Sequence, residues 1–93
     1  MAREALRLTV EGQVQGVGYR WWALGKARSL GLAGWVRNRR DGSVEILAIG
    51  DAQALAALAA ACGTGPSAAR VTSVGRHSAE DDGSTGFDER ATA

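Results

Sequence analysis

The chain of 93 residues is 45% hydrophobic and 23% charged, which is enough to build one globular core but not two. We therefore expect a single domain over residues 1–93. No apolar stretch approaches the roughly 20 residues of a membrane span, and the first residues lack an apolar signal core. The single cysteine, Cys62, excludes an intramolecular disulfide and a cysteine-rich metal fold. These features predict a cytoplasmic protein whose stability comes from packing.

The charge is nearly balanced overall but unevenly distributed along the chain. Eleven basic and ten acidic side chains give a net charge of +1, too small to predict a nucleic-acid or membrane partner. Residues 1–50 hold eight Lys/Arg and four Asp/Glu, whereas residues 51–93 hold three and six. The first half is therefore where we expect an anion to bind, although an arginine-rich composition can equally reflect a GC-rich genome.

The first third of the chain predicts a strand, a loop and a helix. Residues 6–11 alternate apolar and polar side chains, which is typical of a strand with one buried face. Residues 12–20 contain three glycines that interrupt regular structure and predict a loop. Beyond them, apolar side chains recur at helical spacing, so we expect a helix over 21–30 with Gly31 as its C-terminal cap.

The rest of the chain predicts a hairpin, a second helix and one or two further strands. Two strand-like runs, 34–39 and 43–49, are joined through a short turn with a strong hairpin signal. An alanine-rich segment with an apolar stripe predicts a helix over 52–62. Residues 70–74 predict a shorter fourth strand, and residues 86–90 offer one large apolar side chain to an edge strand.

Two registers are compatible with the hairpin. A two-residue turn would set Arg37 opposite Ile46, whereas a three-residue loop with a bulge at Gly42 would set Arg37 opposite Glu45. The bulged register is favoured because it pairs residues of matching character across the strands. It also turns Asn38 toward the face that the helices cover.

The order strand, helix, strand, strand, helix, strand is that of the split βαβ or ferredoxin-like arrangement. We therefore expect an α+β sandwich in which two helices pack on one face of a four- to five-stranded antiparallel sheet. This fold supports many unrelated functions, so function has to be argued from a site.

The loop before the first helix is a candidate anion site. It directly precedes a helix N-terminus, where unpaired backbone N–H groups and the helix dipole attract negative charge. Gly16 and Gly18 would let these N–H groups turn inward, and Arg20 could add a two-pronged contact. A glycine-rich turn followed by a solvated arginine explains the same pattern, and the spacing matches neither a Walker motif nor a dinucleotide fingerprint.

Asn38 is the second candidate, because an amide on the covered face is costly without a partner. The partner could be a structural hydrogen bond to the adjoining loop, or a water or substrate oxygen beside the anion site. The remaining polar and aromatic residues are assigned structural roles: His77 to a surface or edge, residues 80–82 to a polar turn, and Trp21, Trp22 and Trp35 to packing rather than to a nucleic-acid stacking platform.

Two segments, residues 10–20 and 30–45, resemble the signature motifs of acylphosphatases. They read VEGQVQGVGYR and LGLAGWVRNRRDGSVE. The resemblance implies a small cytoplasmic enzyme that hydrolyses the carboxyl-phosphate bond of acyl phosphates without a metal, a cofactor or a covalent intermediate. Arg20 matches the phosphate-binding arginine of the family, and Asn38 matches the asparagine that positions the attacking water. The phosphate-binding residues implied are Gln15, Gly16, Val17, Gly18, Tyr19 and Arg20.

The resemblance also implies the partners: a small-molecule acyl phosphate as substrate, inorganic phosphate as product and competitive inhibitor, and neither nucleic acid nor membrane. We expect a monomer. Two departures from the family pattern are Ala23, where many members carry Thr or Ser, and the last strand, which keeps only Phe87 of its usual apolar alternation. Two competing hypotheses are a phosphate-binding module like those at the front of hydrogenase-maturation proteins and a single-stranded RNA-binding sheet, which the near-neutral charge opposes.

Overall fold

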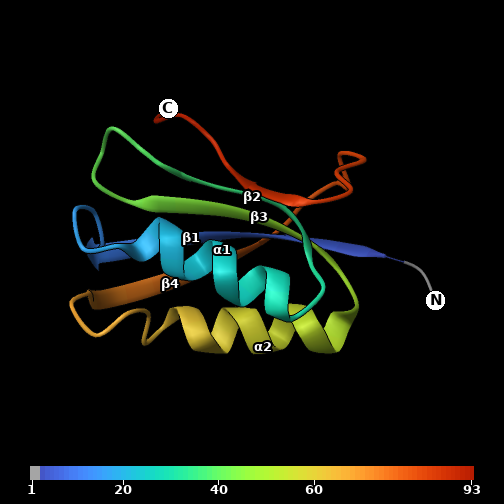
Figure 1. Ribbon diagram of the computed structural model, residues 1–93, viewed down its shortest axis with the longest axis horizontal. Coiled ribbons are helices and arrows are strands. Elements are labelled where there is room, and N and C mark those ends of the chain that lie inside the picture. The colour runs from blue at the N-terminus through green and yellow to red at the C-terminus, as the bar shows by residue number, and fades with distance from the viewer. Residues whose placement is uncertain (1–2) are drawn as a thin grey trace.

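A computed structural model describes residues 3–93, which form a five-stranded sheet with two helices packed on one of its faces (Figure 1). The strands are β1 (Glu4–Gln13), β2 (Ala33–Asn38), β3 (Val44–Gly50), β4 (Arg70–Ser78) and β5 (Phe87–Glu89), and the helices are α1 (Tyr19–Ser29) and α2 (Ala52–Cys62). The order across the sheet is β4-β1-β3-β2-β5. The predicted ferredoxin-like α+β fold is confirmed.

The fifth strand corrects one detail of that prediction. β1, β2, β3 and β4 pair antiparallel, but β5 pairs parallel with β2, so the sheet is mixed. The chain leaves β4 at one edge of the sheet, turns back, and reaches the opposite edge (Figure 1). Because β4 and β2 run in opposite directions, a strand that reverses direction after β4 must lie parallel to β2.

The predicted hairpin register is confirmed. Arg37 pairs with Glu45 and Asn38 with Val44, as expected for the bulged three-residue loop. The side chains of Arg37 and Arg39 both reach the Glu45 carboxylate, at 2.6 and 3.2 Å. Burial alone would raise the pKa of Glu45, but the hydrogen bonds from the two arginines outweigh it and lower that pKa.

Strand β1 is longer than predicted because Gly12 lies within it rather than opening the loop. A register shift between Glu11 and Gly12 lets pairing with β4 continue to Gln13. The backbone of β4 lies so close that a Cβ on Gly12 would come within 2.1 Å of the Arg70 carbonyl oxygen. The glycine therefore permits a bulge inside a strand, and the loop begins only at Val14.

The helix ends follow local sequence signals. Helix α2 has the predicted bounds, and the predicted glycine cap of α1 is confirmed. Gly31 has a φ of 71°, and its N–H bonds the Arg28 carbonyl while the N–H of Leu32 bonds that of Ala27. These two bonds form a Schellman motif, which satisfies carbonyls that the end of a helix leaves free.

The main core lies between the sheet and the two helices. Its fully or nearly buried side chains include Leu8, Val10, Val36, Val44, Ile46 and Ala48 from the sheet and Ala23, Ala27, Leu55, Leu58 and Cys62 from the helices. Burial raises the pKa of Cys62 to about 11, so its thiol stays protonated at neutral pH. No helix within residues 3–93 has the length and apolar character needed to cross a bilayer.

The structural roles assigned to the tryptophans and to His77 hold with one exception. Trp22 packs on Tyr19 with ring centroids 5.3 Å apart, and Trp35 is buried on the other sheet face. His77 is exposed on the edge strand β4, as predicted. Trp21 is the exception, because 75% of its surface is exposed. The prediction that Trp21 packs against other residues is therefore wrong, since Trp21 lies on the face of α1 that points away from the core.

Candidate active site

The loop between β1 and α1 leads into a helix N-terminus that has no side-chain cap. The loop ends at Gly18, whose left-handed backbone (φ 81°) makes it the N-cap of α1. The helix therefore begins at Tyr19, two residues earlier than predicted, and Arg20 lies in its first turn. A glycine N-cap brings no side chain to the first N–H groups, which also lack intrahelical partners. These N–H groups remain free to bind an anion.

Arg20 and Asn38, 18 positions apart in sequence, line the same small cavity at this helix start. The cavity has a volume of about 150 Å³, and Gly16, Gly18 and Tyr19 also line it. Arg20 comes from the first turn of α1 and Asn38 from the last residue of β2. The two residues chosen from the sequence thus meet because β2 ends beside the N-terminus of α1.

Asn38 presents a polar atom that the fold leaves unsatisfied. Its Oδ1 is buried and accepts no hydrogen bond from residues 3–93. The backbone of Asn38, by contrast, is held firmly: it pairs with Val44 of β3, and its carbonyl accepts a hydrogen bond from the N–H of Ala93 at 3.0 Å. A buried amide oxygen without a partner is costly, so a water or a ligand atom is the natural donor to it.

Arg20 is available for an anion, whereas other arginines of the basic half of the chain are engaged elsewhere. Arg37 and Arg39 share the Glu45 carboxylate, and Arg28 donates to the Phe87 carbonyl at 3.0 Å. Within residues 3–93, no carboxylate lies within ion-pair distance of Arg20. The Arg20 guanidinium in the cavity is therefore not neutralised by an ion pair with a carboxylate of residues 3–93.

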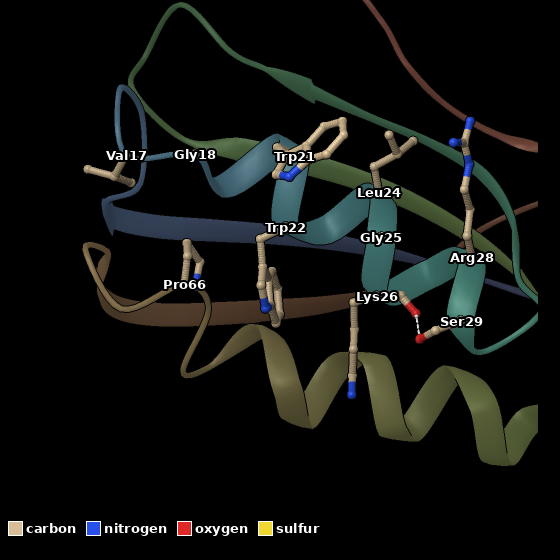
Figure 2. A pocket seen from close by; sticks show the side chains of 10 residues that line it. All are labelled: Val17, Gly18, Trp21, Trp22, Leu24, Gly25, Lys26, Arg28, Ser29 and Pro66. Carbon is tan, nitrogen blue, oxygen red and sulfur yellow. Dashed lines mark hydrogen bonds between the residues drawn. The ribbon is translucent and has the colours of Figure 1, made fainter.

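Of the six loop residues chosen from the sequence, Gln15 and Val17 do not line the cavity, and Tyr19 lines it while its hydroxyl is hydrogen-bonded in the core. Gln15 donates from its side-chain amide to the carbonyls of Arg39 and Ser43, at 2.7 and 2.9 Å, and ties the loop to the hairpin. The Tyr19 hydroxyl donates to the buried Cys62 carbonyl at 2.7 Å, and burial raises the pKa of this phenol. Val17 lines a neighbouring groove instead (Figure 2). Gln15 and Tyr19 therefore brace the loop through their side chains.

Glu89 is a cavity residue that sequence reasoning missed. It ends β5, where it pairs with Val36, and it lines the cavity together with Arg20 and Asn38. Side chains alternate along a strand, so Glu89 shares a face with the buried Phe87 and points toward the helix side. Glu89 reaches the cavity only because β5 pairs in parallel with β2. The sequence carries no local signal for that pairing, so Glu89 could not be found from it.

The cavity combines features that suit a phosphoryl group. Backbone N–H groups and the positive end of α1 meet a guanidinium, which matches the oxygens of phosphate in two-pronged fashion. Asn38 adds an oxygen that can accept a hydrogen bond from a water. Glu89 adds a negative charge at the rim, which opposes the binding of a dianion.

The chain is similar to known acylphosphatases along most of its length. The family model for acylphosphatase matches residues 6–89. A curated acylphosphatase from Acidiphilium cryptum is 50% identical over 88 residues, covering 95% of this chain and 97% of its own.

Solved structures give the same result at the level of the fold. An acylphosphatase from Coxiella burnetii superposes with a TM-score of 0.91 at 33% identity, over 95% of this chain and 93% of its own. An acylphosphatase from Bacillus subtilis gives 0.89 at 39% identity, over 92% and 97%. The family model and these relatives together cover nearly all of the chain, which therefore belongs to the acylphosphatase family of enzymes.

Proposed function

We propose that the protein hydrolyses acyl phosphates by direct attack of a water that Asn38 positions on a phosphoryl group held by Arg20 and the backbone N–H groups of loop 15–20. The observation that carries this proposal is the single cavity that Arg20 and Asn38 both line, together with the buried Asn38 Oδ1 that lacks a hydrogen-bond partner. Among the loop residues, Gly16, Gly18 and Tyr19 line that cavity together with Arg20.

The chemistry asks little of the protein beyond positioning and charge stabilisation. Water attacks phosphorus, the bond from phosphorus to the acyl oxygen breaks, and the carboxylate leaves with the electron pair. Both protons of the water remain on the phosphate, so dianionic substrate and water give a carboxylate and dihydrogen phosphate. Arg20 and the N–H groups stabilise the charge on the phosphoryl oxygens, and the carboxylate is a good leaving group without protonation.

The direct test is phosphate release from benzoyl phosphate by the purified protein in excess chelator. We expect turnover to be the same with and without added magnesium, because Arg20 and the start of α1 already supply positive charge at the phosphoryl group. A strict magnesium requirement would contradict this mechanism. Absence of phosphate release under all of these conditions would contradict the proposed activity itself.

Glu89 provides a second test, because its charge lies beside the proposed phosphate position. We expect Glu89→Gln to tighten competitive inhibition by inorganic phosphate by about threefold to tenfold at low ionic strength, since it removes repulsion from a dianion. The effect should shrink in high salt. The measurement is the phosphate inhibition constant at two salt concentrations.

The matched control is Asp88→Asn, which removes the same charge one residue away. Asp88 is exposed, pairs weakly with Arg28 at 3.7 Å, and does not line the cavity. If both variants tighten phosphate binding equally, overall charge is responsible and Glu89 has no local role.

A further inference from the structure

The exposed face of α1 carries a groove beside the cavity. Its volume is about 670 Å³, and Figure 2 shows Trp21 and Trp22 projecting from the helix in opposite directions, with Gly25 one turn further along. Val17 and Pro66 lie at the end nearest the loop (Figure 2). This α1 groove is therefore walled mainly by apolar side chains and opens to solvent.

We propose that the α1 groove binds the acyl group of the substrate and makes the enzyme select aromatic and longer aliphatic acyl phosphates over acetyl phosphate. This inference rests on the proposed function, because it takes the phosphoryl group to lie in the cavity with Arg20 and Asn38. Gly18 and Trp21 line both the groove and the cavity. The groove and the cavity therefore adjoin each other at the N-terminal end of α1.

The direction of attack favours the groove as the place of the leaving group. In phosphoryl transfer, the attacking and leaving oxygens lie roughly in line on opposite sides of phosphorus. Asn38, the water-positioning residue, lines the cavity but not the groove. The acyl oxygen must leave on the side away from Asn38, and the groove adjoins the cavity at Gly18 and Trp21 on the helix.

Gly25 is a second and independent observation. A glycine in a helix interior costs stability relative to alanine, by roughly 1 kcal/mol. Here it is not required by the fold: its φ is not positive, and a Cβ would meet no atom within 4 Å. A side chain at this position would instead fill the groove that Gly25 lines. The residue is thus better explained by the open space above it than by the packing of α1.

Trp21 forms an apolar wall of the groove and is not packed in the core. It is 75% exposed and is the one large hydrophobic side chain so exposed within residues 3–93. An exposed tryptophan beside a binding cavity can bury much of its surface against a ligand, especially against an aromatic ring. A benzoyl group offers such a ring, whereas an acetyl group ends in a methyl.

The experiment compares kcat/KM for benzoyl phosphate with that for acetyl phosphate, both measured as phosphate release. We expect Gly25→Leu, which fills the groove, to lower the benzoyl-to-acetyl ratio by about tenfold. Leucine favours a helix more than glycine does, so the variant is expected to fold. Trp21→Ala, which removes one wall, should also lower the ratio.

The control is Gln53→Leu, which adds the same side chain to an exposed position of α2 outside the groove and should leave the ratio unchanged. A Gly25→Leu ratio within about twofold of wild type would overturn the inference. Failure of the proposed function has a different signature: acetyl phosphate hydrolysis would survive Arg20→Ala. In that case the phosphoryl group does not lie in the cavity, and the proposal that the α1 groove binds the acyl group is also rejected.

Discussion

Arg20→Ala should weaken phosphate binding and lower kcat/KM for benzoyl phosphate by at least about a hundredfold, because it removes the charged donor at the phosphoryl oxygens. Arg20 is the arginine that lines the cavity, and no carboxylate among residues 3–93 pairs with it. Its guanidinium is therefore free of an ion pair and can bind the phosphoryl oxygens. The phosphate inhibition constant should rise and kcat/KM should fall in the same variant.

The lysine variant tests the geometry rather than the charge. Arg20→Lys keeps the positive charge but replaces the planar fork by an ammonium, so we expect it to recover little of the lost activity. Near-wild-type hydrolysis by this variant would contradict a two-pronged contact. Arg40→Ala is the matched control, because it removes an equal charge from an exposed turn that does not line the cavity.

Asn38→Ala should separate binding from turnover. The substitution removes an amide whose Oδ1 is buried without a donor among residues 3–93, while Arg20 and the loop N–H groups stay in place. We expect kcat to fall by about a hundredfold to a thousandfold, with the phosphate inhibition constant nearly unchanged. The melting temperature should hold or rise slightly, because an unsatisfied polar atom is removed from a buried position.

Gln15→Ala is the comparison variant that distinguishes a structural role of Asn38 from a water-positioning role. Its side chain does brace the loop, through hydrogen bonds to the carbonyls of Arg39 and Ser43. Its loss should therefore weaken phosphate affinity, lower the melting temperature and slow turnover together. If Asn38→Ala shows the same parallel losses, then Asn38 is a structural residue and the water-positioning role is rejected.

The amino-acid sequence by itself determined the elements whose signals are local. Helix α2, the Gly31 cap and the pairing of Arg37 with Glu45 were all predicted, because side-chain periodicity, capping and turn length act between residues that are close in sequence. Asn38 was placed on the helix-covered face for the same reason: the hairpin register alone decides which face each residue occupies.

Only the tertiary structure decided what depends on contacts between distant segments. The parallel pairing of β5 follows from which sheet edge the returning chain reaches, and that edge brings Glu89 to the cavity. The exposure of Trp21 and the groove over Gly25 likewise depend on how α1 is rotated against the sheet. Local pattern does not specify these features, because the free energy that selects them comes from burial between elements that are far apart in the chain.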